Sequence, residues 1–387
     1  MPFFIASTVG TSLLTNLLRE DESGRIGDIY DHANDSEEEI PEELYQMAEE
    51  TVKRAVEDLR GADAKSIRKA SAELNGILSF YEQEPMSGRD QHRLIATDTA
   101  LGQLTAEGTK EILEDWGAGG AVQVHTPKGL TTKNTNSLRD GVKRFLDWCE
   151  QTLPEYRENE YEVVFNLTGG FKSLQGILNT VGTFYADRMI YIFQAGPELI
   201  TIPGLPVRLD TDLFENTPAR FLRLEALDRV PEGTLPKAQY EDVPEALIDE
   251  VEERVYSFSE WGKLLWNRAR RSILEQEKCF DLARLRYDER FRSDVGAADP
   301  DSRRRLHETL AIVSVMLEVH GGDTAPLKES GSLQYKNYEG KTTEKGNPIG
   351  HFQLYEDREG ERVSCQAKEE GLLLRRFGRH DAVNNAP

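Results

Sequence analysis

The sequence contains few cysteines and no long apolar run, and each absence excludes a class of protein. Its 387 residues include only three cysteines, Cys149, Cys279 and Cys365, which are too few and too widely spaced for a disulfide scaffold or a four-cysteine zinc site. No apolar run approaches the roughly 18 residues that a membrane helix needs. The first residues lack the basic flank and cleavage site of a secretory leader. We therefore expect a soluble, reduced, cytoplasmic protein with no membrane partner.

Positive charge is scarce in the first two-thirds of the chain. Lys and Arg number 47 against 69 Asp and Glu, which gives a net charge of −22. Residues 1–250 carry 24 basic and 45 acidic residues, whereas residues 251–387 carry 23 and 24. A field of this sign repels nucleic acid in bulk, so any RNA contact has to be local or guided. Hydrophobic residues still make up 38% of the sequence, and its length suits two or three domains.

Strands and helices alternate through the first half of the sequence. Short apolar segments predict buried strands at residues 3–7, 94–96, 121–125, 162–167 and 189–193, and helical patterns separate them. This alternation is typical of a parallel, Rossmann-like α/β sheet. Such sheets bind ligands in the loops that follow the carboxyl ends of their strands. We expect the polar loops at residues 8–12, 97–99 and 168–172 to lie together at that edge.

The segment Thr168-Gly169-Gly170-Phe171-Lys172 joins a predicted strand directly to a predicted helix. Paired glycines let the backbone approach a ligand closely, and the first turn of a helix offers unpaired N–H groups to an anion. Lys172 adds a positive charge and Thr168 adds a hydroxyl. The spacing is not that of a Walker A loop. A tight turn that simply needs two glycines remains the alternative interpretation.

This loop and the segment Thr8-Val9-Gly10-Thr11-Ser12 resemble the two ligand loops of CARF domains, the CRISPR-associated Rossmann-like sensors of cyclic oligoadenylates. The resemblance covers residues 1–215. It implies a homodimer that binds a cyclic oligoadenylate across its two-fold axis, with cyclic tetra-adenylate as the expected activator and no other cofactor. The ligand-binding residues that it implies are Thr8, Gly10, Thr11, Ser12, Asn16, Thr97, Asp98, Asn166, Thr168, Gly169, Gly170 and Lys172.

The last third of the chain has a different pattern. Residues 216–283, strongly helical and charged from about residue 243, are interpreted as a helical linker or dimer segment. A helix is expected over about 301–320, then a Gly- and Lys-rich loop, then short strands at 351–355, 362–366 and 372–377. Lysines, arginines and histidines without clustered carboxylates suit metal-independent RNA cleavage, in which cations stabilise the phosphorane.

Residues 284–387 resemble RelE-type toxins, which are ribosome-dependent messenger-RNA endonucleases. The order of helix, basic loop, strands and a terminal Gly378-Arg379-His380-Asp381 segment is that of the family. The family usually has an arginine in the central strand, where this sequence offers His351 or Gln353, and a catalytic aromatic residue near the position of Asn384. The resemblance implies a small α+β domain without a metal. Its candidate catalytic residues are Lys345 and His351 near the attacking hydroxyl, Arg376 and Arg379 on the phosphate, and His380 as the acid.

Two other interpretations stay open. Arg375 and His380 enclose four residues, as in the Arg-x4-His pattern of HEPN ribonucleases, which are helical domains that cut free RNA. A ligand-controlled transcription regulator would need a winged helix in the middle segment, where no helix carries a clear basic face, so we expect no direct DNA binding. The favoured hypothesis is a type III CRISPR effector, activated by a cyclic oligoadenylate, that cleaves mRNA on the translating ribosome and so inhibits translation.

Overall fold

The computed structural model describes residues 1–387 except 20–22, 171, 193–197, 207–209, 228–239, 241 and 355–359, and for residues 23, 172, 173, 251 and 252 it describes the backbone alone. The chain divides into two compact units, unit 1 (residues 1–208) and unit 2 (residues 209–387). Within the described ranges, no helix combines the length and the apolar character needed to cross a bilayer.

Unit 1 is built around a six-stranded sheet with the strand order β3-β2-β1-β4-β5-β6. The strands are β1 (Phe3–Thr8), β2 (Gln91–Ile95), β3 (Ala121–His125), β4 (Glu162–Asn166), β5 (Arg188–Ile192) and β6 (Leu199–Pro203). Strands β1 to β5 pair in parallel, and β6 pairs antiparallel with β5 at one edge. The predicted α/β class with a parallel sheet is confirmed. The edge strand β6 was not predicted; it is mostly exposed and ends in a proline, as edge strands tolerate.

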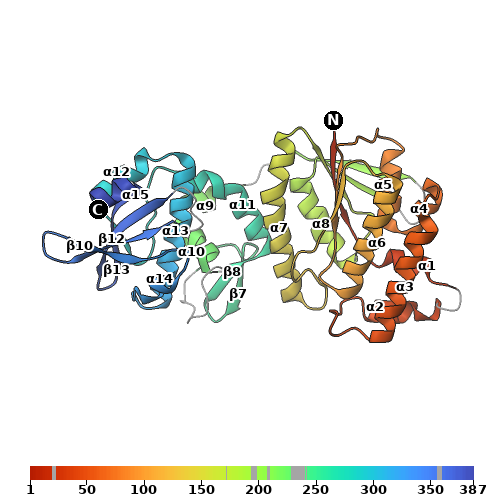
Figure 1. The fold of residues 1–387 in the computed structure, drawn as a ribbon, viewed down its shortest axis with the longest axis horizontal. Coiled ribbons are helices and arrows are strands. Elements are labelled where there is room, and N and C mark those ends of the chain that lie inside the picture. The colour runs from red at the N-terminus through yellow and green to blue at the C-terminus, as the bar shows by residue number, and fades with distance from the viewer. Residues whose placement is uncertain are drawn as a thin grey trace. The chain divides into compact units, whose positions relative to one another are not determined.

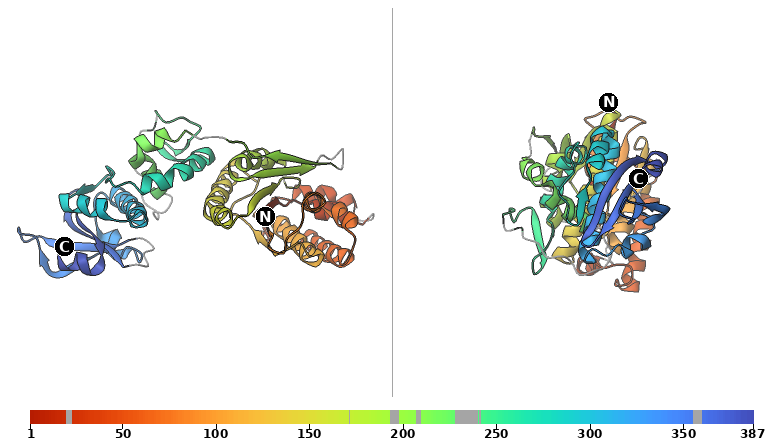
Figure 2. Two further views of the ribbon diagram at one scale, coloured as in Figure 1. Left: turned by 90° about the horizontal axis from the view of Figure 1, so that it is seen from above. Right: turned by 90° about the vertical axis from the view of Figure 1, so that its left-hand side faces the viewer.

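Helices cover both faces of this sheet. In Figures 1 and 2, α7 (Thr135–Glu158) and α8 (Lys172–Tyr185) lie on one face, and the red and orange helices lie on the other. That second group comprises α1 (Ser12–Leu17), α2 (Ile26–Asp31), α3 (Glu42–Leu59), α4 (Ala64–Ala70), α5 (Ala72–Tyr81) and α6 (Ala100–Trp116). The helix predicted from about residue 105 begins at Ala100, because Thr99 accepts a hydrogen bond from the backbone N–H of Gly102 and caps it.

The strand order places a topological switch point between β1 and β4. β1 has β2 on one side and β4 on the other, and the helices that lead to these two neighbours lie on opposite faces. In sheets of this kind a crevice opens at the carboxyl ends of the two strands, and ligands bind there. The polar loops that follow β1 and β4 are therefore in the position that the sequence predicted for them.

Unit 2 contains a five-stranded sheet with the order β10-β11-β12-β13-β9. Its strands are β9 (Leu285–Tyr287), β10 (Lys336–Thr342), β11 (Pro348–Gln353), β12 (Glu361–Lys368) and β13 (Gly371–Arg379). All pairs are antiparallel except β13 with β9. A hairpin of β7 (Ile248–Glu252) and β8 (Val255–Phe258) forms a separate small sheet. The helices are α9 (Asp212–Asn216), α10 (Pro218–Leu227), α11 (Glu260–Leu274), α12 (Glu289–Ala297), α13 (Pro300–Val319), α14 (Ala325–Glu329) and α15 (His380–Asn385).

Two segments of unit 2 differ from the sequence prediction. The helix expected from about residue 243 is a hairpin followed by α11, which starts where the Ser259 hydroxyl caps the N–H of Gly262. Trp266 on α11 is fully buried, and it packs in one hydrophobic core with Phe352 and Phe377 of the five-stranded sheet. The loop expected around residue 340 contains strand β10. This strand is almost entirely exposed, so its sequence carries no apolar alternation that could reveal it.

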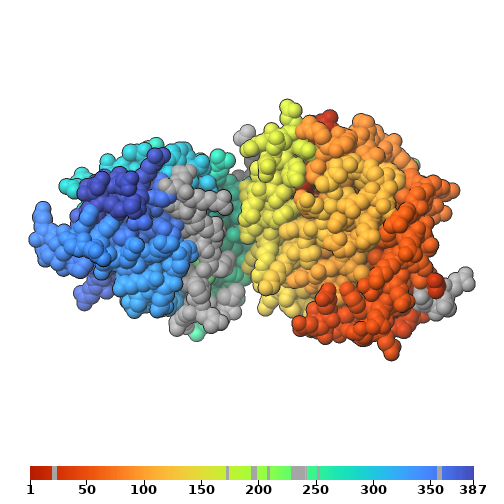
Figure 3. Space-filling view, viewed as in Figure 1, coloured from red at the N-terminus to blue at the C-terminus, as the bar shows by residue number. Residues whose placement is uncertain are grey.

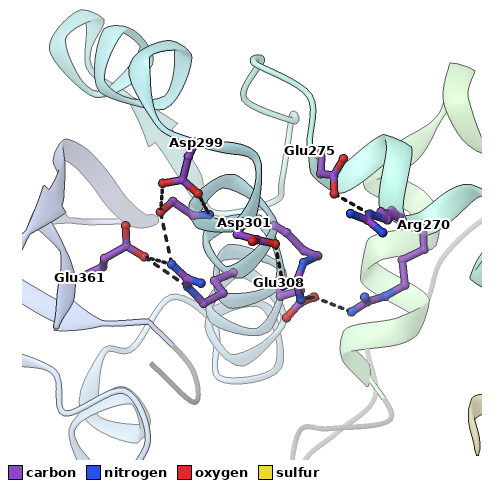
Figure 4. A network of polar contacts seen from close by, with 10 residues as sticks. Arg270, Glu275, Asp299, Asp301, Glu308 and Glu361 are labelled. Carbon is purple, nitrogen blue, oxygen red and sulfur yellow. Dashed lines mark hydrogen bonds and ion pairs between the residues drawn. The ribbon is translucent and has the colours of Figure 1, made fainter. Parts of the chain in front are cut away.

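Helix α13 is the scaffold to which the other elements of unit 2 are tied. Arg305 of α13 donates to Glu361 on β12 at 2.8 Å, and Glu308 accepts from Arg270 of α11 at 2.9 Å, as Figure 4 shows. Arg270 also donates to Glu225 of α10 at 2.8 Å. These largely buried pairs fix the sheet and two helices to a single element.

Candidate functional site

The loops that follow β1 and β4 touch each other. The Thr8 hydroxyl donates to the carbonyl oxygen of Gly169 at 2.7 Å. A Cβ atom on Gly10 would lie 3.1 Å from Gly170 Cα, so the two backbones meet where a larger residue would not fit. Gly170 has a φ of 95°, in the left-handed region that favours glycine. The two glycine-containing loops form one continuous surface at the switch point.

Asn166 and Thr168 organise the second loop. Asn166 is fully buried, and its side-chain amide donates to the Glu73 carbonyl at 3.0 Å while its Oδ1 accepts from the Thr168 N–H at 3.2 Å. The Thr168 hydroxyl oxygen is buried and finds no hydrogen-bond partner among the described residues. The backbone of Lys172 begins α8, and its side chain lies outside the part of the chain that the structure describes.

Other residues expected at the ligand lie in different places. Thr97 is buried and its hydroxyl bonds with that of Thr99 at 3.0 Å. Asp98 accepts from the N–H of Gly129 at 2.7 Å, and thus connects the loops that follow β2 and β3. Asn16 is exposed and donates to the carbonyl of Lys69 at 3.4 Å, whereas Thr11 is buried.

A carboxylate that the sequence analysis missed lies directly under both loops. Glu73, on α5, is completely buried and accepts hydrogen bonds from the Gly10 N–H at 2.6 Å and the Ser12 hydroxyl at 2.7 Å. In the sequence, Glu73 could have been noticed as the one acidic residue of a helix that otherwise contains apolar and small polar residues. Its partners are more than sixty positions away in sequence, so no local pattern could have revealed the contact.

The second candidate site is one face of the five-stranded sheet. Side chains alternate between the two faces of a strand, and here one set, including Phe352, Val363 and Phe377, is buried in the core. The opposite set is mainly polar: besides Ile349 and Leu373 it includes Lys336, Tyr338, His351, Gln353, Arg362, Ser364, Gln366 and Arg376. The register places His351 opposite Ser364, and Ser364 opposite Arg376. We call this set the polar face.

His351 is the most strongly perturbed group on the polar face. It is only 4% exposed, and its ring stacks on Tyr338 with centroids 4.1 Å apart. Burial and the positive charges of Arg362, Lys336 and His380 lower the pKa of His351 to about 4. Arg362 Nη1 lies 3.2 Å from His351 Nε2, and since arginine can only donate, this nitrogen is the acceptor and Nδ1 carries the proton. The single acceptor nitrogen of this neutral imidazole therefore faces Arg362, and the protonated Nδ1 is buried without a hydrogen-bond partner among the described residues.

His380 and Asn384 lie on α15 beside the same cluster. Asn384 Nδ2 is 2.9 Å from His380 Nε2, and the Tyr338 hydroxyl donates to Asn384 Oδ1 at 2.6 Å. Lys341 donates to the carbonyl of Asn384. In Figure 3 the dark blue C-terminal residues lie at the surface of unit 2. The fold thus brings His351 of β11 and His380 of α15 close enough for their charges to interact.

The remaining predicted catalytic residues divide between two places. Arg376 is held by Asp294 of α12 at 2.7 Å, and with Lys345 it lines a cavity of about 420 Å³. The same cavity contains Arg290 and Arg375. Arg379 pairs in register with Glu361, and strand alternation puts it on the face opposite Arg376.

Arg362 and Tyr338 also escaped the sequence analysis. The order Arg362, Ser364, Gln366 at every second position was a usable signal for the polar face, because the intervening residues are apolar. Tyr338 lies on the strand that the sequence did not predict. The Arg-x4-His pattern of a HEPN domain lies here on a β-strand and the start of a short helix, and not within a helical bundle.

Similarities to known proteins were found. Residues 68–205, which include α5, β2 and the loop after β4, match a family described as "CRISPR-associated protein (Cas_APE2256)". Among solved structures, the chain is similar to Can2 from Sulfobacillus thermosulfidooxidans in complex with cyclic tetra-adenylate, at 14% sequence identity and a TM-score of 0.24. That alignment covers 51% of this chain and 63% of Can2, so the chain spans less than two thirds of that protein. No curated protein matches the chain.

Proposed function

We propose that the chain is a CRISPR-associated effector whose unit 1 binds a cyclic oligoadenylate and whose unit 2 is a RelE-like endoribonuclease. The observation that carries the proposal is the polar face, where a neutral His351 lies among arginines, in a chain that matches a CRISPR-associated family over residues 68–205. The two glycine-containing loops at the switch point of unit 1 support a ligand site there.

The acidic unit 1 would bind an anionic ligand through local groups and not through bulk charge. Backbone N–H groups at the start of α8 are unpaired by the helix, and they favour an anion. Lys172 would add a positive charge at the same point. We propose cyclic tetra-adenylate as the ligand, held between two copies of unit 1 in a homodimer.

On the polar face, the proposed reaction is a transesterification of RNA. In this proposal Arg362 moves from His351 Nε2 to the phosphate, and the freed Nε2 takes the proton of the 2′-hydroxyl. The 2′-oxygen attacks the adjacent phosphorus, while the bond from phosphorus to the 5′-oxygen breaks and His380 gives that oxygen a proton. The products are a 2′,3′-cyclic phosphate and a 5′-hydroxyl. Arg362 and Arg376 lie on the same face as His351 and would stabilise the charge that develops on the phosphate.

Lys345 and Arg379 have different positions in this proposal. Lys345 shares the cavity with Arg376 and would contact the RNA backbone beside the reacting phosphate. Arg379 lies on the other face by strand alternation, so we assign its proposed role on the phosphate to Arg362. Messenger RNA on the translating ribosome is the proposed substrate, and the ligand would act by shifting unit 2 toward an active state.

The experiment that tests the function supplies cyclic tetra- or hexa-adenylate and then offers naked RNA and translating ribosomes separately. Ligand-dependent cleavage only on ribosomes supports the proposal. Equal cleavage of free RNA contradicts the ribosome as partner, and absence of cleavage with ligand-dependent DNA binding favours a transcription regulator. Lys172→Ala should weaken activation, whereas Lys65→Ala, an exposed lysine on α4, should leave it unchanged.

A further inference from the structure

Glu73 contacts both loops at the switch point, through its side chain and its backbone. Its carboxylate accepts from the Gly10 N–H and the Ser12 hydroxyl of the first loop, at 2.6 and 2.7 Å. The Ser12 oxygen in turn accepts from the N–H of Ala72, in the first turn of α5, at 3.1 Å. The first loop is thereby tied to the start of α5 through a closed set of hydrogen bonds.

The second loop rests against the same side chain. A Cβ atom on Gly169 would lie 2.3 Å from Glu73 Oε1, so only glycine lets this loop pack on the carboxylate. The Glu73 carbonyl accepts from the Asn166 amide at 3.0 Å. Both loops therefore take their position from one residue that lies beneath them.

A carboxylate with no exposed surface is costly unless its oxygens are hydrogen-bonded. Glu73 meets this condition with two charge-assisted hydrogen bonds, and as the second residue of α5 it also lies at the positive end of the helix dipole. No ion pair to Glu73 is found among the described side chains. The carboxylate thus accepts the hydrogen bonds of a backbone N–H and a hydroxyl, which are the donors that glycine-containing loops commonly offer to phosphates.

We propose that Glu73 is the positioning residue of the ligand loops. It holds the Gly10 N–H and the Ser12 hydroxyl inward, so neither contacts a phosphate of the ligand, and the phosphates bind on the side of the second loop and α8. This inference rests on the proposed function for the identity of the ligand. The loop-holding role itself needs no ligand.

The test compares Glu73→Gln, Ser12→Ala and their double variant with the unaltered protein, and uses Glu82→Gln as the control. Glu82 directly follows the same helix, is 58% exposed and pairs with Arg68. Glutamine keeps an acceptor for the Gly10 N–H, but it carries no charge, and its NH2 group can only donate to the Ser12 oxygen, so the charge-assisted hydrogen bond becomes a weaker neutral one. Ser12→Ala removes that hydrogen bond from its other side. The measurements are hydrogen exchange of the Gly10 amide and of residues 167–170, and affinity for cyclic tetra-adenylate.

We expect each single variant to speed exchange in both loops and to weaken ligand affinity by about tenfold, the effect of one buried hydrogen bond. The double variant should lose less than the sum of the two single losses, because both changes weaken the same hydrogen bond. If the Glu73 variants lowered the melting temperature and left the ligand affinity unchanged, Glu73 would be a purely structural residue and the proposal would be wrong. Fully additive losses of affinity in the double variant would show that Glu73 and Ser12 do not act through one hydrogen bond. Glu73→Ala, if it folds, should loosen both loops further.

The two proposals fail in different ways. If the unaltered protein does not bind cyclic tetra-adenylate, the proposed function is wrong. Hydrogen exchange of the amides in the two loops still tests whether Glu73 holds the loops in place. If the protein binds the ligand and the Glu73→Gln variant shows the exchange and affinity of the Glu82→Gln control, the positioning role is wrong and the proposed function stands.

Discussion

The ring of His351 stacks on the ring of Tyr338, with centroids 4.1 Å apart and planes inclined by 28°. The stack excludes water from one side of the imidazole, and Arg362 lies against its Nε2. Together these contacts keep the imidazole neutral at physiological pH and fix its orientation.

Replacing His351 should test its proposed role as the base. We expect His351→Ala to lower the rate of RNA cleavage by about a hundredfold or more, the usual contribution of a general base. Because the pKa of His351 is about 4, its protonation should not reduce the rate of the unaltered protein between pH 8 and pH 5. A cleavage assay over this range measures both effects. A rate that fell tenfold per pH unit below pH 7, and lost this fall in the variant, would contradict the neutral base.

Arg362 should be needed for both cleavage and the low pKa of His351. In Arg362→Gln we expect cleavage to fall by about a hundredfold, because a cation that stabilises the transition state is lost. The pKa of His351 should rise toward its ordinary value, since one of the neighbouring positive charges is removed. Nuclear magnetic resonance titration of the His351 ring measures the second effect. Arg292→Gln is the control, because Arg292 lies over the ring of Tyr287, outside the polar face.

Gly169 should not tolerate a side chain. Its replacement by alanine would place a Cβ atom 2.3 Å from the Glu73 carboxylate, so the loop after β4 must move. We expect Gly169→Ala to lose affinity for cyclic tetra-adenylate by at least tenfold, as calorimetry would show. Gly176→Ala on α8 meets no atom within 4 Å and should bind normally. Equal affinity of the two variants would show that the packing of this loop does not matter for binding.

Arg270 should be important for the stability of unit 2 and not for ligand binding. Arg270→Met leaves the carboxylates of Glu225 and Glu308 without this partner, and removal of one member of a buried ion pair costs about 3–5 kcal/mol. Arg271→Met is a matched control, because the neighbouring Arg271 is exposed and its pair with Glu275 is worth only about 0.3–0.5 kcal/mol. Denaturant unfolding measures both free energies.

Four histidines should make the protein sensitive to acid. Burial lowers the pKa of His92, His125, His307 and His351 from 6.5 to about 4 in the folded chain. Between these values the unfolded chain binds protons that the folded chain does not, so the stability present above pH 6.5 is lost as the pH falls toward 4. Each unit contains two of them. We expect the free energy of unfolding of each unit to fall by up to about 2.7 kcal/mol per pH unit near pH 5, which denaturant titrations would show.

The sequence was informative where the determinants are close together along the chain. The strand, the glycine turn and the helix around residues 162–185 are adjacent, and their order was enough to place the loop after β4 at the carboxyl edge of the sheet. His351 and Arg376 could be selected because the order of elements in residues 284–387 resembles RelE-type toxins and because cationic side chains suit metal-independent RNA cleavage. The parallel sheet followed from the same alternation of short apolar segments and helices.

Other features depend on distant contacts and could not be read in advance. Glu73 meets Gly10 only because α5 packs beneath the switch point. Strand β9 has three residues, too few for any periodic pattern, and it exists because β13 supplies its hydrogen bonds. The hairpin formed by β7 and β8 is rich in glutamate, a residue that favours helices, and its place in the core of unit 2 overrides that preference.

The parallel pairing of β9 with β13 has a consequence for how the protein is made. Residues 285–287 complete the sheet only when residues 371–379 have been synthesised, so the contact that closes unit 2 joins segments far apart in the chain. Such non-local pairing forms late and slowly. The polar face needs β11, β12 and β13 together, so it forms only after β13 has emerged from the ribosome and paired with β12.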